Sequence, residues 1–389
     1  MIIEQRTTKL EPYIVRFNNE KIDNVTEYKF LGTLIKNNGN LNASLTDLAK
    51  KARKALFSLK THAAFLGNFP VNVSCNLFDS LIKPILTYNA EISYMDTYQS
   101  YYRAKGRLKS QNKDIDNFQY LDKTPFEKVH VNFCKYILGT KKTSANLGVK
   151  AELGRQPIEK YIKTQAILYW ARLNTENINP LLKESYTLSK HLDSQGVYTW
   201  STFIKDSTQE MNIDIQKVMS CQNMEQVNKL KTWIKNITSK FYSELLENKI
   251  NSLNENNKLF LYKNIKVKQD QEFYLKYPNF ETRRLFTKIR ISDHNLLIEK
   301  GRYLKIPRDN RTCPTCKTLE DENHFLLHCQ INNVLRIKLF NDMAIDNPMF
   351  PNLSDTEKLV VLLNPSNINQ VKKTGSFIKQ SLELRTGDS

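Results

Sequence analysis

The feature that most constrains this chain is a short cluster of cysteine and histidine residues near its C-terminal end. Cys313 and Cys316 form a Cys-x-x-Cys pair, and His324 and Cys329 follow in the spacing C-x2-C-x7-H-x4-C. A Cys-x-x-Cys pair can wrap two thiolates around one metal ion, and an added imidazole and thiolate complete a tetrahedral zinc site. Four protein ligands leave no position open, so we expect a structural Zn²⁺ that holds a segment too small to build its own core.

Two alternatives remain open for this cluster. Cys313 and Cys316 could form a disulfide or remain free thiols, although their place within the cluster favours a metal. His328 could replace His324 as the third ligand, but its position next to Cys329 would require a strained geometry. We therefore predict that the ligands are Cys313, Cys316, His324 and Cys329.

The net charge of the chain narrows the class of partner. Fifty-eight Lys and Arg residues against forty Asp and Glu residues give a net charge of +18 and an isoelectric point near 9.4. This balance suits a polyanion, with nucleic acid as the expected partner and an anionic membrane surface as the alternative. The sequence contains no long apolar run, signal-like segment or lipidation motif. We therefore expect no membrane partner and an intracellular location, in the cytoplasm, the nucleus or both.

Composition predicts a mainly α-helical chain. Only eleven of 389 residues are glycine, and the abundance of Lys, Leu, Ile and Asn favours helix over sheet in two or three domains. Strand-like segments occur only at 13–17, 21–22 and 28–35. They suffice for at most a small antiparallel β element, whose apolar face must pack on another part of the chain.

Apolar periodicity places several helices after these strands. Leucine and alanine recur at intervals of three and four residues over 45–59, which predicts an amphipathic helix. A helix over 73–81 is expected to close before Pro84, because proline disfavours a helical residue in front of it. Further helices are expected at 126–138 and 158–173.

Two segments are candidates for nucleic-acid contact. The first is the basic side of the helix over 45–59, for which a solvated helix face is an equal alternative. The second is the stretch 95–125, expected as a loop, where tyrosine rings could stack on bases while cations follow phosphates. A polar surface loop would have a similar composition. The candidate residues are Lys50, Lys51, Arg53, Lys54, Tyr101, Tyr102, Arg103, Lys105, Arg107 and Lys109.

Several segments form a series from about residue 12 to residue 340. In chain order they are Tyr28-Lys-Phe-Leu-Gly32, Ala49-Lys-Lys-Ala-Arg-Lys-Ala-Leu56, Lys83-Pro-Ile-Leu-Thr-Tyr88, Glu127-Lys-Val-His130 with Phe133-Cys-Lys135, Leu138-Gly139, Ala151-Glu-Leu-Gly-Arg-Gln-Pro157 and Ile298-Glu-Lys-Gly-Arg-Tyr303, followed by the Cys/His cluster. This series resembles the C-terminal part of the reverse-transcriptase polyprotein of a non-LTR, LINE-type retrotransposon. The segment 151–155 and the Cys/His cluster are its most specific parts.

The resemblance implies a domain order and a set of partners. In that family the palm ends in a β element, helices form a thumb that grips template and primer, and a CCHC zinc knuckle is thought to bind nucleic acid. The implied fold is a thumb-like helical bundle between a small antiparallel β element and a small zinc-binding module, with RNA, DNA and an upstream polymerase module as partners. The implied domains are a palm-end β remnant at 1–40, a thumb-like helical domain at 41–178, a C-terminal helical domain at 179–300, a CCHC zinc module at 301–345 and a helical tail at 346–389.

The carboxylates that DNA polymerisation requires are missing from this sequence. Reverse transcriptases hold two Mg²⁺ ions partly through a Tyr-x-Asp-Asp hairpin, and no Asp-Asp pair occurs in the chain. Tyr94-Met-Asp96-Thr97 resembles this motif only superficially, and neither an endonuclease pattern nor a P-loop is present. We therefore expect a nucleic-acid-binding fragment that is not an enzyme on its own. The alternatives are a helical protein-interaction scaffold and a functionless remnant of a transposable element.

Overall fold

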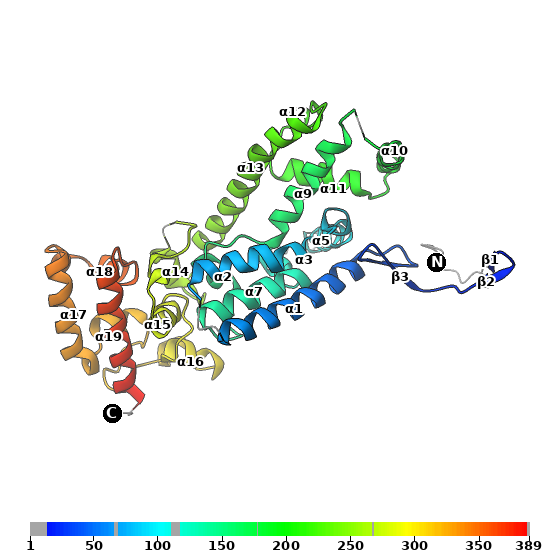
Figure 1. Cartoon of the computed structure of the whole chain (residues 1–389). Helices are drawn as coiled ribbons and strands as arrows, with labels where there is room; N and C mark the ends of the chain where they lie inside the picture. The colour runs from blue at the N-terminus through cyan, green and yellow to red at the C-terminus, as the bar shows by residue number, and fades with distance from the viewer. Residues whose placement is uncertain (1–13, 66–68, 110–116, 177, 267, 387–389) are drawn as a thin grey trace. The chain divides into compact units, whose positions relative to one another are not determined.

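The computed structural model describes residues 14–65, 69–109, 117–176, 178–266 and 268–386 (Figure 1). These residues are mainly α-helical, with small antiparallel hairpins near the N-terminus and the Cys/His cluster toward the C-terminus, as the sequence predicts. None of the described helices combines the length and the apolar character that crossing a membrane requires. The chain forms two compact units: unit 1 comprises Met1–His62, Leu77–His130 and Pro157–Tyr242, and unit 2 comprises Ala63–Asn76, Val131–Gln156 and Ser243–Ser389.

The two units are not consecutive segments of the chain. The stretches 41–178 and 179–300, each of which the resemblance implies as one domain, both contribute residues to both units. Helices that are distant in sequence therefore pack into the same unit, which sequence periodicity alone does not reveal.

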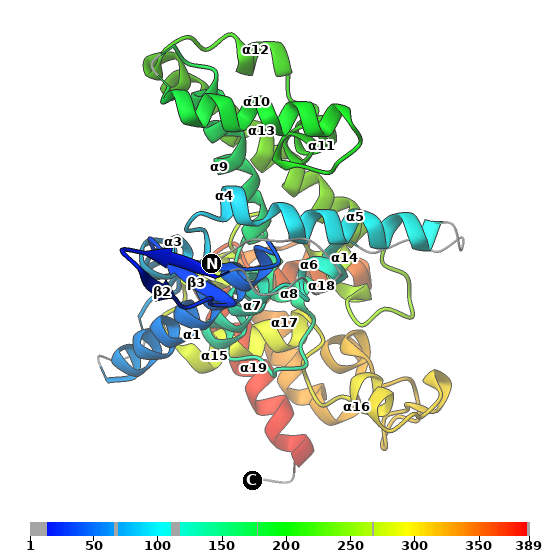
Figure 2. The same cartoon turned by 90° about the vertical axis from the view of Figure 1, so that its right-hand side faces the viewer.

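Unit 1 contains both hairpins and most of the helices from the first two thirds of the chain. Within it α10 packs along α11, as Figure 2 shows. Its elements are β1 (Val15–Phe17), β2 (Glu20–Ile22), β3 (Glu27–Phe30), β4 (Thr33–Lys36), α1 (Asn42–Phe65), η1 (Phe78–Ile82), α3 (Lys83–Leu86), α4 (Ala90–Ser93), α5 (Met95–Lys109), α6 (Asn117–Leu121), α9 (Ile158–Leu173), α10 (Pro180–Ser194), α11 (Trp200–Glu210) and α12 (Ile215–Met219). Helices α7 (Pro125–Leu138) and α13 (Met224–Asn251) have residues in both units, and α1 and α2 (Val71–Leu77) each reach across the boundary at their C-terminal ends.

The segment 28–35, expected as one strand, is a hairpin. Strand β3 pairs antiparallel with β4, and its turn holds Leu31 and Gly32 at φ values of 44° and 83°. Two consecutive residues with positive φ are typical of a tight hairpin turn, and leucine gives no sequence signal for one. The side chains of β1, β2 and β3 are exposed, whereas β4 is half-buried and the Tyr88 hydroxyl donates to the Leu31 carbonyl at 2.8 Å. The expected packing on another part of the chain is therefore seen for the second hairpin.

Two predicted helices have the expected faces. Leu45, Leu48, Ala52 and Leu56 are buried on α1. Helix α9 has the predicted bounds, and the described helices of unit 1 bury most of its length. Periodic apolar residues located both helices, although α1 buries one stripe whereas α9 is buried on nearly every side.

The stretch 95–109 is helix α5, although a loop was expected there. Tyr98 is fully buried, and Tyr101 is only 8% exposed. These tyrosines are three residues apart and so lie on one face of the helix, where they supply the apolar stripe that leucine provides elsewhere. An abundance of tyrosine and lysine gives no apolar periodicity, because neither residue is typical of a core, so the sequence does not predict this helix.

The helix expected over 73–81 does not close before Pro84. Helical backbone continues from α2 (Val71–Leu77) through η1, a single π-helical turn, into α3. The N–H of Lys83 donates to the carbonyl of Phe78, five residues earlier. Such a wider turn makes room for the proline ring that would otherwise strike the preceding turn, so Pro84 is tolerated near the start of α3.

Unit 2 contains the C-terminal third of the chain and the segment 131–156. Its helix α15 packs on α19, which in turn packs on α17. Its elements are α2, α8 (Asn146–Glu152), α14 (Phe260–Ile265), η2 (Phe273–Lys276), α15 (Phe280–Arg290), α16 (Leu297–Tyr303), η3 (Arg308–Asn310), η4 (His324–His328), η5 (Gln330–Asn332), α17 (Asn333–Asp346), η6 (Phe350–Asn352), α18 (Asp355–Leu363) and α19 (Ile368–Thr386).

A buried charge network joins three parts of unit 2. The guanidinium of Arg290 donates to both carboxylate oxygens of Glu152 at 3.0 Å and to the carbonyl of Leu363 at 2.6 Å. Lys266 donates to the Ala151 carbonyl at 2.7 Å. Arg290 and Glu152 are both fully buried, so each charge depends on the other to offset its loss of hydration.

Candidate metal centre

The four predicted ligands come together in unit 2. One ligand atom each from Cys313, Cys316, His324 and Cys329 lies within 4.8 Å of the others, and all but Cys316 are buried. The Sγ atoms of Cys316 and Cys329 are 4.0 Å apart. All six cysteines of the chain are described and free, so no disulfide links Cys313 to Cys316. Three thiols and an imidazole at this spacing could bind a metal ion such as zinc.

The first two ligands lie on a short loop closed by backbone hydrogen bonds. The N–H of Cys313 donates to the Thr318 carbonyl at 2.7 Å, and the N–H of Lys317 donates to the Cys313 carbonyl at 2.9 Å. Lys317 has a φ of 59°, and Thr312 pairs with Leu319 across the base of the loop. This closure turns both sulfur atoms toward the same side, which the Cys-x-x-Cys spacing predicts.

The third ligand starts a one-turn π-helix. His324 is the first residue of η4, and the Asp321 carboxylate accepts its backbone N–H at 2.8 Å. Its imidazole Nδ1 lies 3.2 Å from the Thr318 hydroxyl oxygen, whereas its buried Nε2 has no hydrogen-bond partner among the described residues. A buried nitrogen without a partner is costly. Nε2 is therefore the atom available to a metal.

The fourth ligand directly follows this turn. Cys329 donates its N–H to the His324 carbonyl at 2.8 Å, and its own carbonyl accepts from the Arg336 guanidinium at 2.7 Å. The three residues between the histidines, Phe325 to Leu327, are buried. The turn thus anchors His324 and Cys329 in the core of unit 2.

The surroundings of two ligands favour the deprotonated forms that bind a metal. Burial raises the pKa of the Cys313 thiol, but backbone N–H groups of Cys316 and Thr315 stabilise the thiolate and bring that pKa below its ordinary value. Burial also lowers the pKa of the His324 imidazole, and the positive charge of Arg385 lowers it further. Burial raises the pKa of Cys316, so this thiol would have to release a proton when a metal binds.

His328 lies outside the cluster. Its Nε2 is 2.8 Å from the Asp355 carboxylate, and its side chain is 48% exposed. The structure thus places His324, and not His328, among the ligands, in agreement with the argument from strain.

Sequence reasoning missed the side chains that hold the ligands in place. Arg385, at the end of α19, donates to the Cys329 sulfur at 2.9 Å and also pairs with Glu320. Thr318 orients His324, and Arg336 holds Cys329. Such outer contacts orient metal ligands and tune their charge. Arg385 lies 56 positions after Cys329, so no local spacing could indicate its role.

The basic residues predicted on α1 are mostly directed to solvent. Lys50, Arg53 and Lys54 are exposed. Lys51 is held by the Asp47 carboxylate at 2.8 Å and lies 3.4 Å from the Gly32 carbonyl. The structure therefore leaves three of the four cations on an open helix surface.

The candidates on α5 divide into a buried and an exposed group. The ring of Tyr101 packs 4.9 Å from that of Tyr120 in the core, and the hydroxyl of Tyr102 accepts from Tyr98 at 3.0 Å. Tyr101 is only 8% exposed, so little of its ring surface is open to a base. Arg103, Lys105 and Arg107 are exposed. The side chain of Lys109 lies outside the described residues.

The chain matches no protein-family model, no curated protein sequence and no solved structure. The arrangement of its own residues is therefore the basis for any functional conclusion.

Proposed function

We propose that this chain is a nucleic-acid-binding fragment of a non-LTR retrotransposon reverse transcriptase, which positions template RNA or target DNA in the cytoplasm or nucleus. The observation that carries the proposal is a Cys₃His cluster within a chain of net charge +18. The series of sequence segments that resembles this family supports the assignment. The proposed partners are nucleic acid and an upstream polymerase module.

The metal in this proposal is a structural Zn²⁺. Three thiolates and one imidazole fill a tetrahedral coordination sphere, and such a closed site gives no access to a substrate. Sulfur and imidazole ligands also suit Zn²⁺ better than Mg²⁺ or Ca²⁺, which prefer oxygen. The metal would join the loop of Cys313 and Cys316, much of which is exposed, to the buried π-helical turn of His324 and to Cys329.

The exposed cations of α1 and α5 are the proposed contacts to phosphates. Lys50, Arg53 and Lys54 follow one another within five residues, and Arg103 and Lys105 add a second exposed group. Cations of this kind bind the sugar–phosphate backbone without reading sequence. Polymerase activity would belong to the upstream module, because the Asp-Asp pair of that chemistry is missing from this sequence.

One observation favours a second candidate function, a protein-interaction scaffold. Helix α17 exposes Val334 by 81%, Ile337 by 54% and Ile345 by 78%. These residues share one side of the helix, and an exposed apolar stripe is typical of a surface that binds another protein. A functionless remnant of a transposable element would show neither nucleic-acid nor protein binding.

A direct binding measurement tests the proposal. Fluorescence anisotropy with a labelled single-stranded RNA should give a Kd of about 10⁻⁶ M or tighter at physiological salt, with similar values for unrelated sequences. The same protein with primed template, dNTPs and Mg²⁺ should extend no primer. Failure to bind RNA and DNA at about 10⁻⁴ M would overturn the proposal. Primer extension that Asp96→Ala abolishes would overturn its non-catalytic part.

A further inference from the structure

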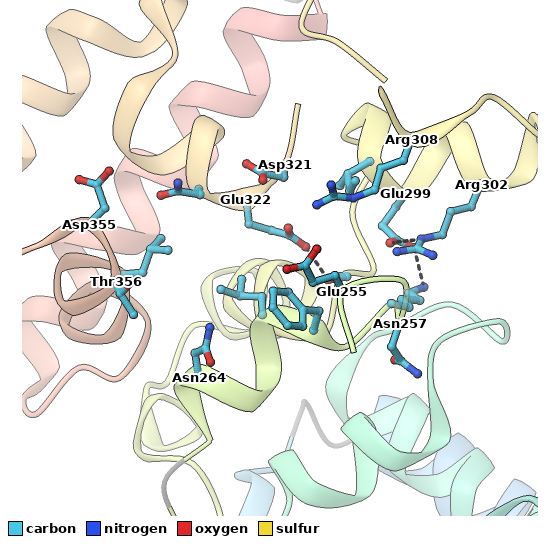
Figure 3. A pocket seen from close by; sticks show the side chains of 17 residues that line it. Glu255, Asn257, Asn264, Glu299, Arg302, Arg308, Asp321, Glu322, Asp355 and Thr356 are labelled. Carbon is cyan, nitrogen blue, oxygen red and sulfur yellow. Dashed lines mark hydrogen bonds and ion pairs between the residues drawn. The ribbon is translucent and has the colours of Figure 1, made fainter. Parts of the chain in front are cut away.

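Unit 2 has a pocket whose charge disfavours an anion. Its volume is about 240 Å³, and five carboxylates line it against three cations: Glu255, Glu299, Asp321, Glu322 and Asp355 against Lys258, Arg302 and Arg308 (Figure 3). A phosphate in this pocket would meet an excess of negative charge. A polyanion that contacts unit 2 therefore needs a different surface of the unit.

A second region of unit 2 carries cations instead. The loop after α7 contains Lys141 and Lys142, and helix α15 contains Arg284 and Lys288. Residues four positions apart lie on the same face of a helix, so the two cations of α15 are neighbours. Lys288 is half-buried, and the other three residues are exposed. These four residues form the basic cluster.

The loop is held against α15 and the segment that follows it. The Nε of Arg284 donates to the Gly139 carbonyl at 3.0 Å, and the Lys141 ammonium donates to the side-chain oxygen of Asn295 at 2.9 Å. Gly139 has a φ of 64°, and a Cβ added there would lie 2.7 Å from the ring of Phe280. Any other residue would have to displace this ring, so glycine permits the close approach.

No member of the basic cluster has an ion pair with a carboxylate in the part of the chain that the structure describes. The exposed carboxylate of α15, Glu281, is paired with Lys379 at 3.1 Å. The buried carboxylate of Asp293 accepts the backbone N–H of Lys141 at 2.9 Å, and not its ammonium. The basic cluster therefore keeps a net positive charge.

The pKa of Lys288 shows that these cations are close enough to repel one another. Burial lowers the pKa of its ammonium, repulsion from Arg284 and Lys141 lowers it further, and attraction from Asp293 opposes the change. Like charges four residues apart on a helix destabilise it. An anion bound at the basic cluster would remove this repulsion.

We propose that the basic cluster binds a phosphate group, either in the backbone of a nucleic acid or as free inorganic phosphate. For a nucleic acid, the inference rests on the proposed function and adds a contact in unit 2 to those on α1 and α5. Among the described residues only the Nε of Arg284 is hydrogen-bonded, so its guanidinium can still offer two N–H donors to one phosphate. Lys141 and Lys288 add charge from the loop and from the next helical turn. A phosphate contact of this kind reads no base.

The first test measures the affinity for a labelled single-stranded RNA by fluorescence anisotropy. Arg284→Gln should weaken binding about tenfold, the effect of losing one hydrogen bond to a charged group. The same change should lower the log–log salt slope by about 0.7. Lys288→Gln should act in the same direction. Arg284→Lys should keep the slope but recover only part of the affinity, because lysine retains the charge without the forked donors.

Lys263→Gln is the matched control. Lys263 lies on α14 in unit 2 and is exposed, and its ammonium has no hydrogen bond or ion pair among the described residues. This variant removes the same charge as Arg284→Gln, so a general effect of net charge would weaken both equally. We expect Lys263→Gln to bind RNA as the wild type does. Zinc content and thermal melting show whether each variant is folded.

The second test identifies the source of the phosphate. Melting temperatures are measured in inorganic phosphate and in chloride at equal ionic strength, because a ligand that binds the folded state raises the melting temperature. A larger rise in wild type and Lys263→Gln than in Arg284→Gln supports binding of free phosphate. Loss of RNA affinity in Arg284→Gln without this difference supports a phosphate within a strand.

The two tests separate failure of the inference from failure of the proposed function. If Arg284→Gln, Lys288→Gln and Lys263→Gln bind RNA equally and respond equally to phosphate, the inference is overturned and the proposed function stands. If the wild type binds no RNA but shows the phosphate response that Arg284→Gln lacks, the proposed function is overturned and the basic cluster remains a site for free phosphate. Absence of both RNA binding and a phosphate response overturns both.

Discussion

The Cys₃His cluster and the basic helix α1 are both short local segments, but their side chains behave differently. In the cluster four ligand atoms converge within 4.8 Å, and Thr318 and Arg385 hold two of the ligands in place. On α1 the side chains of Lys50, Arg53 and Lys54 are exposed to solvent, whereas Lys51 is held by the Asp47 carboxylate. A metal site requires the protein to bring its ligand atoms together, so the site can be recognised from the structure of the protein alone. Cations that bind phosphates need not converge, because the phosphates are arranged along the nucleic acid.

The largest effect is expected when the Cys₃His cluster loses one of its ligands. Cys316→Ser should lose the metal and unfold the region between about 302 and 340, because the apparent folding energy from structural zinc is about 10–16 kcal/mol in zinc-finger peptides. Elemental analysis should give about one zinc per chain for wild type and almost none for the variant, with new proteolysis confined to this region. His328→Ala is the control and should keep the zinc. Equal zinc in wild type and Cys316→Ser would show that the cluster is not the site.

The second-largest effect is expected at Arg290, a fully buried cation of unit 2. Arg290→Met should reduce the free energy of unfolding by about 3–5 kcal/mol, because it leaves the buried Glu152 carboxylate without its partner. Urea denaturation measures this loss. In contrast, Lys229→Met removes an ion pair whose side chains are at least 75% exposed and should cost less than about 0.5 kcal/mol. If both variants lost a similar amount of unfolding free energy, the buried ion pair would contribute no more to stability than the exposed one.

Smaller effects are expected on α5, where Tyr101 should contribute to stability and Arg103 to RNA binding. Tyr101→Leu should cost about 2 kcal/mol of stability by leaving space in the core, and it should not change RNA affinity. Arg103→Gln should do the reverse, with unchanged stability and a salt dependence of RNA binding that is lower by about 0.7 in the log–log slope. RNA binding that depends on Tyr101 while stability does not would support stacking of a base on this ring.

The smallest effect is expected at Lys160, a half-buried cation in unit 1. Burial, with repulsion from Lys83 and Lys235 and a weak opposing attraction from Asp79, lowers its pKa from 10.5 to about 8. The unfolded chain therefore binds more protons than the folded chain between about pH 8 and 10.5, so this residue makes stability rise with pH across that window. Urea midpoints from pH 7 to 10 should rise less in Lys160→Met than in wild type. Parallel profiles would show that Lys160 is not desolvated.

The features that the sequence predicted most reliably depend on residues within a single short segment. The four ligands, the stripe on α1 and the bounds of α9 all follow from spacing within one segment. The hairpin turn at Leu31 and the π-helical turn before Pro84 were missed, because each places a residue in a conformation that its type rarely signals. Arg385 was missed for another reason. Its contact with Cys329 joins elements far apart in the chain, and a single sequence carries no record of that pairing.

The most direct test of the central claim is the salt dependence of single-stranded RNA binding by the zinc-loaded protein and by a variant with Lys50, Lys51, Arg53 and Lys54 all changed to Gln. Each phosphate contact adds about 0.7 to the log–log slope, and Lys51 is already paired with Asp47. We expect a steep slope for wild type that falls by about 2 in the variant, with zinc content and melting temperature unchanged. Equal slopes, or a wild-type affinity that does not respond to salt, would contradict nucleic-acid binding through this surface.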